Sequence, residues 1–130
     1  MKGIRVLLVD DEIDFSRVLS RRLEKRGMCV STASCASEAM ETLRLEEMDV
    51  VLLDVRMPGR DGVRLLGEIK RLYPQVAVLM LTAHINSDIV ISCLAMGACD
   101  YLLKPTDVEE IEGKISDAAV RRNKGPFGKA

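Results

Sequence analysis

Five short apolar runs punctuate the chain, at residues 4–9, 28–33, 50–53, 76–81 and 101–103. Three of them contain the continuously apolar sequences VLLV, VVLL and VAVLML. Runs without polar alternation are typical of parallel strands that are buried on both faces of a sheet. The second run, MCVSTA, alternates more, which predicts a strand nearer the edge of that sheet.

The segments between these runs carry apolar residues at helical spacing. Their predicted buried faces comprise Phe15, Val18, Leu19 and Leu23; Ala36, Ala39, Met40 and Leu43; Leu65, Leu66, Ile69 and Leu72; Ile85, Ile89 and Cys93; and Val108, Ile111, Ile115, Ala118 and Ala119. Gly27, Gly97 and Pro74 are expected to end three of these helices. Thr106 with Glu109 three residues later predicts a capping box at the start of the last one.

Strand and helix patterns alternate five times along the chain. Such alternation predicts an α/β fold with a doubly wound, five-stranded parallel sheet and helices on both faces. The last ten residues, RRNKGPFGKA, are basic and then rich in Gly and Pro, as in a frayed helix end that runs into a linker. We expect one domain over residues 1–121 and a linker-like tail over 122–130.

Composition narrows the function without identifying it. A chain of 130 residues with 48% hydrophobic residues fits one folded domain. Lys plus Arg number 19 and Asp plus Glu number 20, which argues against a general nucleic-acid-binding face. The four cysteines form no CxxC pair and are interpreted as reduced, core-packing thiols. No run is long and apolar enough to span a membrane, so a cytoplasmic location and no membrane partner are expected.

Polar side chains follow four of the five apolar runs: Asp10, Asp11 and Glu12 the first, Asp54 the third, Thr82 the fourth, and Lys104 the fifth. The carboxyl ends of parallel strands share one sheet edge, so these side chains are expected to converge there. Clustered carboxylates repel one another unless a cation joins them, and Mg²⁺ favours such oxygen ligands. With a lysine and a hydroxyl added, the set predicts a site for a phosphoryl group that an in-line carboxylate attacks.

Each of these residues also has an ordinary structural interpretation. Asp10 or Asp11 could cap the first helix, Thr82 could cap the fourth, and Lys104 could be a solvated surface lysine. Their joint placement at four strand ends favours the functional interpretation.

Four motifs bring these residues into one known pattern. They are the Asp-Asp pair at 10–11 after VLLV, LLDVRMPGRDG at 52–62, LTAH at 81–84 and YLLKP at 101–105. In order, spacing and strand context they resemble the receiver domain of bacterial two-component response regulators, over roughly residues 4–120. The resemblance implies the flavodoxin-like strand order 2-1-3-4-5.

The resemblance also implies a role for each residue of the site. Asp54 would accept a phosphoryl group from the phosphohistidine of a histidine kinase, or from a phosphotransfer protein. Asp11, Asp54 and the backbone carbonyl of Arg56 would bind Mg²⁺ directly, with Asp10 helping through water. Lys104 would bind the phosphoryl oxygens. On this view the domain catalyses its own phosphorylation and dephosphorylation and turns over no separate substrate.

A second group of residues would transmit or tune the signal. Thr82 and Tyr101 would form a switch pair: the Thr82 hydroxyl swings toward the phosphoryl group, and the Tyr101 ring turns into the vacated space. Arg56 and His84 could tune the lifetime of the phosphorylated state or simply be loop residues. The peptide before Pro105 could be cis, which would direct Lys104 inward. Gly62 is interpreted as giving backbone freedom before the third helix.

Three other functions fit the sequence less well. A haloacid-dehalogenase-type phosphatase needs a second Asp where Arg56 stands, and a flavodoxin-like FMN carrier needs a Gly-rich phosphate loop where the chain has DDE. A receiver-like binding module that acts without phosphorylation fits poorly with the complete acid, Thr and Lys set. For the output, an effector domain beyond the tail is favoured over a stand-alone receiver, and phosphorylation could drive a homodimer.

Overall fold

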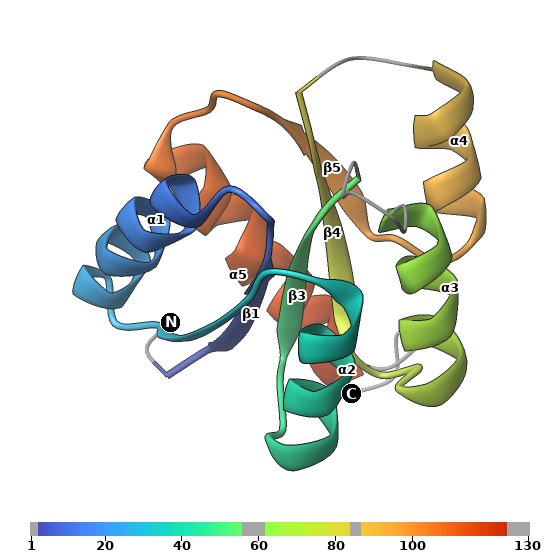
Figure 1. The fold of residues 1–130 in the computed structure, drawn as a ribbon, viewed down its shortest axis with the longest axis horizontal. Helices are drawn as coiled ribbons and strands as arrows, with labels where there is room; N and C mark the ends of the chain where they lie inside the picture. The colour runs from blue at the N-terminus through green and yellow to red at the C-terminus, as the bar shows by residue number, and fades with distance from the viewer. Residues whose placement is uncertain (1–2, 56–61, 84–86, 125–130) are drawn as a thin grey trace.

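The computed structural model describes residues 3–55, 62–83 and 87–124, without the side chains of 87 and 121–124. Strands and helices alternate through them (Figure 1). The strands are β1 Arg5–Val9, β2 Cys29–Ala33, β3 Val50–Asp54, β4 Ala77–Thr82 and β5 Asp100–Leu103. The helices are α1 Ile13–Lys25, α2 Ala36–Leu45, α3 Gly62–Leu72, α4 Ser87–Ala95 and α5 Val108–Lys124.

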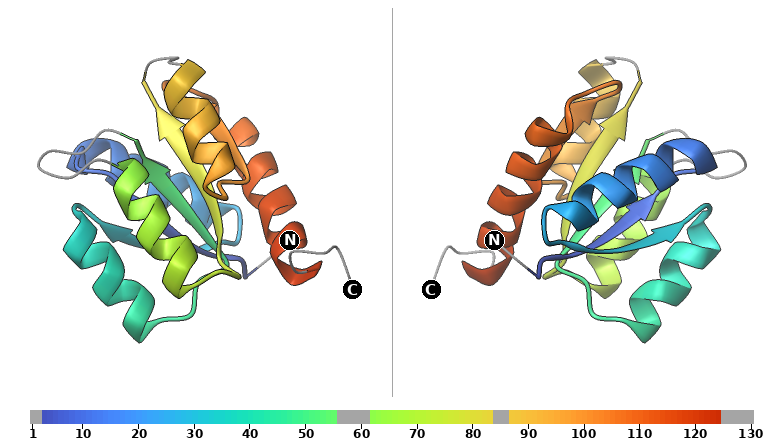
Figure 2. Two further views of the ribbon diagram at one scale, coloured as in Figure 1. Left: turned by 90° about the vertical axis from the view of Figure 1, so that its right-hand side faces the viewer. Right: turned by 90° about the vertical axis from the view of Figure 1, so that its left-hand side faces the viewer.

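The strands form one parallel sheet in the order β2-β1-β3-β4-β5. Helices α1 and α5 cover one face and α2, α3 and α4 the other, and the two panels of Figure 2 look onto these faces from opposite sides. The predicted fold class and strand order are therefore confirmed. Every residue of β3 and β4 is buried, while β2 at the sheet edge is largely accessible, as the apolar and alternating runs predicted.

Two apolar cores lie on either side of the sheet. One contains Leu43, Leu65, Leu66 and Ile69 from α2 and α3, and the other contains Leu19, Leu23, Ile111 and Ile115 from α1 and α5. These residues confirm the predicted buried faces of their helices, but two residues predicted to lie on those faces are exposed. Val18 is 51% exposed and Leu72 is 50% exposed. The buried stripe of α1 runs through Ser16, Leu19 and Leu23, so Val18 lies beside it, and Leu72 is the last residue of α3.

Glycine ends two helices as predicted. Gly27 has φ 93° and Gly97 has φ 111°, the left-handed conformation that follows many helix ends. The predicted capping box of α5 is wrong. The helix begins one residue later, so Asp107 precedes its first turn, and the Thr106 hydroxyl donates instead to Glu110 at 2.8 Å.

The interpretation of the cysteines as core residues is half wrong. All four thiols are free, but Cys29 and Cys35 are exposed, Cys99 is partly buried and only Cys93 is buried. Cys29 is the first residue of the edge strand β2, and Cys35 precedes α2 just after this strand, where the sheet leaves one side uncovered. Among the described residues, no helix has the length and apolar character needed to cross a membrane.

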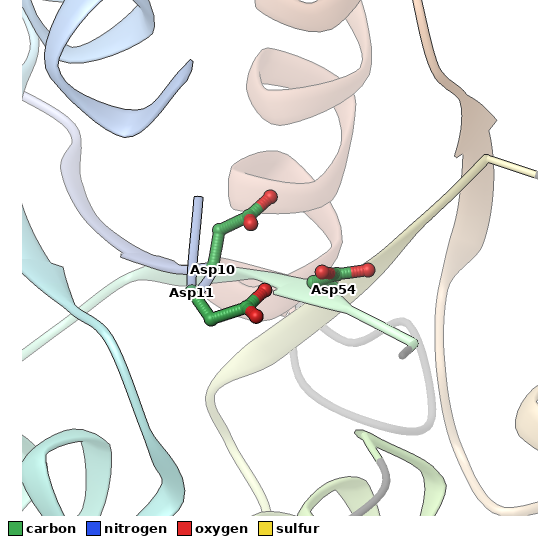
Figure 3. A group of neighbouring side chains, drawn as sticks. All are labelled: Asp10, Asp11 and Asp54. Carbon is green, nitrogen blue, oxygen red and sulfur yellow. The ribbon is translucent and has the colours of Figure 1, made fainter. Parts of the chain in front are cut away.

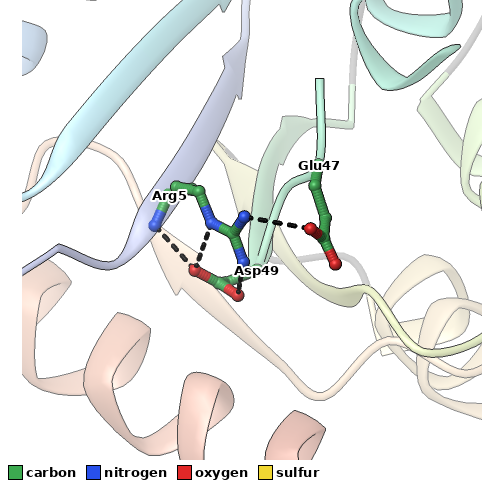
Figure 4. Close-up of polar contacts among 3 residues, drawn as sticks. All are labelled: Arg5, Glu47 and Asp49. Atoms are coloured by element: carbon green, nitrogen blue, oxygen red, sulfur yellow. Dashed lines mark hydrogen bonds and ion pairs between the residues drawn. The ribbon is translucent and has the colours of Figure 1, made fainter. Parts of the chain in front are cut away.

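A charged cluster joins β1 and β3 at the amino end of the sheet (Figure 4). Arg5 contacts both carboxylate oxygens of Asp49, Nη2 at 2.9 Å from Oδ1 and Nε at 3.2 Å from Oδ2, and Nη1 lies 3.2 Å from Glu47. The Arg5 backbone N–H donates to the same Asp49 carboxylate at 2.8 Å. The hydrogen bond with Asp49 raises the pKa of Arg5, outweighing burial. The cluster ties the amino ends of β1 and β3 together, and the register set there brings their carboxyl ends side by side.

Candidate functional site at the carboxyl edge of the sheet

Three carboxylates gather where β1 and β3 end (Figure 3). Asp10 follows the last residue of β1 and Asp54 is the last residue of β3, and the pairing of Val9 with Leu53 places the two side by side. A carboxylate oxygen from each of Asp10, Asp11 and Asp54 lies within 4.8 Å of the others. Asp10 is 1% and Asp54 5% exposed, while Asp11 is open to solvent. The predicted convergence of the three acids is confirmed.

Gly62 explains how α3 can begin directly behind Asp54. Its N–H donates to the Val55 carbonyl at 2.7 Å, and a Cβ at this position would lie 2.2 Å from the Asp54 carbonyl oxygen. The φ of Gly62 is not in the left-handed region, so backbone freedom is not its purpose. Lack of a side chain lets helix and strand approach, which corrects the interpretation from the sequence.

Lys104 reaches into this group of acids from the end of β5. Its backbone N–H donates to the Thr82 carbonyl at 2.7 Å, which extends the pairing of β4 with β5 by one step. The ammonium lies 2.7 Å from Asp10 Oδ2, 2.5 Å from Glu12 Oε1 and 3.9 Å from Asp54 Oδ2. It also lies 4.5 Å from the centre of the Phe15 ring. The peptide between Lys104 and Pro105 is cis, which settles an isomer that the sequence left open.

The charges of the described site do not balance. Burial alone would lower the pKa of Lys104, but its contacts with Asp10 and Glu12 and the charge of Asp54 outweigh burial and raise it. One ammonium therefore faces the carboxylates of Asp10, Glu12 and Asp54, with Asp11 beside them. Hard oxygen donors with excess negative charge are the donor set that suits a divalent cation such as Mg²⁺.

The capping interpretations do not account for these residues. Glu12 precedes α1 in the cap position and makes no side-chain capping bond, while Asp10 Oδ1 accepts the Glu12 N–H at 2.9 Å in a local turn. Thr82 is the last residue of β4, and α4 begins only at Ser87. Lys104 is not a solvated surface lysine, because its side chain is 11% exposed.

Thr82 and Tyr101 lie on neighbouring strands near the acids. Thr82 is 5% exposed and pairs with Leu103, two residues beyond Tyr101 on β5. Tyr101 is 37% exposed, so its ring is accessible at the sheet edge. Arg56 and His84, the predicted tuning positions, lie outside the described residues, as does the Arg56 carbonyl assigned to the metal.

Two neighbours of the site were missed from the sequence. Glu12 was placed at the strand end with Asp10 and Asp11 but was given no role, and it accepts a hydrogen bond from Lys104. Phe15 was assigned only to the core face of α1, and its ring also lies beside that ammonium. The acidic run pointed to Glu12, whereas nothing in the local sequence brings Phe15 to a lysine 89 positions along the chain.

Comparison with known proteins places this fold and site in one class. The family model described as "Response regulator receiver domain" matches residues 6–116. The chain is 41% identical to the DNA-binding transcriptional regulator NtrC of Escherichia coli (strain K12) over 117 residues, which are 90% of this chain and 25% of that protein. The chain belongs to the response regulator receiver domain family.

Solved structures agree with this assignment. A CheY-like receiver domain protein from Methanospirillum hungatei JF-1 superposes with a TM-score of 0.89 at 26% identity, covering 95% of this chain and 98% of that one. The receiver domain of NtrX from Brucella abortus superposes with a TM-score of 0.83 at 30% identity, covering 88% and 97%.

The family defines the general function. The chain is the receiver domain of a two-component response regulator, and receiver domains of this class are phosphorylated by histidine kinases. It spans about a quarter of the length of the curated relatives, 25% for NtrC and 26% for the transcriptional regulatory protein ZraR of Escherichia coli (strain K12).

Proposed function

We propose that Asp54 accepts the phosphoryl group and that the domain acts as a phosphorylation-dependent switch. The observation that carries this assignment is the position of the Asp54 carboxylate. It is buried at the end of a central strand, in a cluster with Asp10 and Asp11, and 3.9 Å from the Lys104 ammonium. A carboxylate flanked by a cation site and an ammonium is suited to attack phosphorus, because both positive charges neutralise phosphoryl oxygens.

Asp10, Asp11 and Asp54 would hold Mg²⁺, Asp11 and Asp54 as direct ligands and Asp10 through water. The backbone carbonyl of Arg56 completes the proposed ligand set. When bound, the ion neutralises the negative charge that builds up on the transferring group. The support within the described residues is the donor set itself, three carboxylates within 4.8 Å of one another.

The transfer starts from the phosphohistidine of a kinase or phosphotransfer protein. A bond forms between an Asp54 carboxylate oxygen and phosphorus while the bond from phosphorus to the imidazole nitrogen breaks. The imidazole leaves with the electron pair and takes up a proton from solvent. Lys104 binds the phosphoryl oxygens in the product. In hydrolysis, water attacks phosphorus, the bond from phosphorus to the Asp54 oxygen breaks, and inorganic phosphate leaves. Asp54 returns to the carboxylate, so the domain modifies and restores only itself.

Thr82 and Tyr101 would convert this modification into a change of surface. The phosphoryl group carries about 1.5 to 2 negative charges, in place of the single charge of the Asp54 carboxylate, and brings three acceptor oxygens beside Thr82. Its hydroxyl donates to one of these oxygens, and the Tyr101 ring turns into the space. The surface of α4, β5 and α5 then differs between the two states. Arg56 and His84 are proposed to tune how long the phosphorylated state lasts.

The remaining assignments are further parts of this proposal. Residues 1–121 form the receiver domain, and 122–130 form a linker to an output domain; this linker starts within the end of α5, Val108–Lys124. An output domain is proposed because the relatives are about four times longer and one is named as a DNA-binding transcriptional regulator. This domain itself binds neither nucleic acid nor membrane, acts in the cytoplasm, and forms a homodimer on phosphorylation.

Incubation with phosphoramidate and Mg²⁺ followed by intact-mass measurement tests this proposal. The wild-type protein is expected to gain the mass of one phosphoryl group, and Asp54→Ala is expected to gain none. Omission of Mg²⁺ is expected to suppress the gain in the wild type. A wild type that gains no mass, or an Asp54→Ala variant that gains as much, would overturn the assignment.

A further inference from the structure

Glu12 engages the lysine on which the proposed phosphoryl site depends. The Lys104 ammonium donates a hydrogen bond to Glu12 Oε1 at 2.5 Å. Its 2.7 Å contact with Asp10 Oδ2 is an ion pair without good hydrogen-bond angles, and Asp54 Oδ2 is 3.9 Å away. Among the described residues, the well-formed hydrogen bond of this ammonium therefore goes to a side chain outside the proposed metal and phosphoryl set.

The Glu12 side chain can be replaced without loosening the helix that it precedes. Its backbone is held at both ends, since the N–H donates to Asp10 Oδ1 at 2.9 Å and the carbonyl accepts the Ser16 N–H at 3.0 Å. Its side chain makes no capping bond and is 63% exposed. By contrast, the Asp10 side chain is fully buried, so Asp10 is a fixed neighbour of the ammonium and Glu12 is an exchangeable one.

We propose that Glu12 is a positioning residue that holds Lys104 in a resting position and competes with the incoming phosphoryl group for its ammonium. This inference rests on the proposed role of Asp54. A phosphoryl group on Asp54 brings three acceptor oxygens that need the same N–H donors. Glu12 must therefore give up or share its hydrogen bond when transfer occurs, and the energy of that bond opposes the transfer.

The exposure of Glu12 limits the size of the effect. Solvent-exposed ion pairs are worth about 0.2–1 kcal/mol, and this range is applied to the Glu12 contact because the Glu12 side chain is 63% exposed. It corresponds to a change in rate of about 1.5- to 5-fold. Loss of the Glu12 contact is therefore expected to raise the rate at which Asp54 is phosphorylated by about this factor. Loss of Lys104 itself would act in the opposite direction.

The decisive measurement compares initial rates of Asp54 phosphorylation by phosphoramidate and Mg²⁺, followed by intact mass. Glu12→Gln removes the charge, and Glu12→Asp keeps it but withdraws the carboxylate by about 1.5 Å, which breaks the contact. Both variants are expected to react about 1.5- to 5-fold faster than wild type. Asp is a favoured cap residue, so Glu12→Asp also guards against an effect of misfolding.

Asp14→Asn is the matched control. Asp14 lies in the first turn of α1 with a side chain 97% exposed and pairs with Arg17 at 3.7 Å, so its removal changes net charge equally without touching Lys104. Its rate is expected to equal that of wild type. A faster Glu12→Gln with an unchanged Glu12→Asp would assign the effect to charge alone and overturn the holding role, as would equal rates in all four proteins. A wild type that is not phosphorylated at Asp54 would instead refute the proposed function.

Discussion

Replacing Gly62 by alanine tests how closely α3 is seated against the strand that carries Asp54. The added Cβ would lie 2.2 Å from the Asp54 carbonyl oxygen and 2.9 Å from the Val55 Cα. Cβ contacts below 3.0 Å are essentially never found, so the separation must grow by at least about 0.8 Å, the difference between 2.2 Å and that limit. Both opposing atoms are backbone atoms of a buried segment in the centre of the sheet, and they cannot turn aside.

Helix α3 must therefore move, and the resulting loss in the free energy of unfolding can be estimated. Its displacement stretches the 2.7 Å hydrogen bond from the Gly62 N–H to Val55, and such bonds contribute about 0.5–1.5 kcal/mol. Overpacking of a well-packed core costs about 1–3 kcal/mol, and the better helix propensity of alanine returns at most about 1 kcal/mol. Gly62→Ala is therefore expected to lower the free energy of unfolding by about 1–3 kcal/mol.

Urea denaturation followed by circular dichroism measures this change, with two other helical glycines as controls. A Cβ added at Gly113 in α5 would have no atom within 4 Å, so Gly113→Ala is expected to stabilise the fold by about 0.5–1 kcal/mol. At Gly67 a Cβ would meet only the flexible end of Met96 at 2.9 Å, so Gly67→Ala is expected to fall between the two. The reasoning fails if Gly62→Ala is as stable as wild type, or if Gly62→Ala and Gly113→Ala shift stability in the same direction.

Three further predictions concern stability measured by the same urea titration. Asp49→Asn weakens the charged hydrogen bonds to Arg5, whose side chain is 40% exposed, and is expected to cost about 1–2 kcal/mol; an unchanged midpoint would contradict a role for this cluster. Leu66→Ala opens a cavity at a fully buried position and is expected to cost about 2–5 kcal/mol, whereas Leu45→Ala, 65% exposed, is expected to change stability by less than about 0.5 kcal/mol. The Glu38 carboxylate accepts hydrogen bonds from the backbone N–H and from the hydroxyl of Ser34. Both bonds lower the pKa of Glu38 below the usual 4.5, the backbone bond more strongly. Its stabilising contribution is therefore present above that value and lost as pH falls through the lowered pKa, so Glu38→Gln is expected to flatten the acid limb of stability against pH.

The sequence alone predicted the parts of the fold that depend on periodicity within one element. The uninterrupted apolar runs of β3 and β4 indicated strands buried on both faces, and Gly27 and Gly97 marked helix ends. The convergence of Asp10 and Asp54 was predictable as well, because parallel strands have their carboxyl ends on one edge of the sheet.

Errors arose where two elements or a helix boundary had to be known. The sequence predicted Thr106 as the cap of the last helix, but α5 begins at Val108, one residue later than that cap requires. Val18 is as apolar as a core residue, yet the stripe through which α1 packs against the sheet leaves Val18 51% exposed. The sequence pattern gives the period of a helix, but it does not fix which side of the helix packs against the sheet and the neighbouring helices.

Only the tertiary structure decided what surrounds Asp54. Gly62 is required by a close approach between α3 and β3, a distance that no local pattern encodes. The engagement of Lys104 by Glu12 joins residues 92 positions apart, and it depends on where α1 begins relative to the end of β5. Residue types and strand ends can be deduced from the sequence because they follow from burial along one segment. Which charges face each other is set by the packing of separate segments, since electrostatic interactions depend on distance in space and on burial rather than on order in the chain.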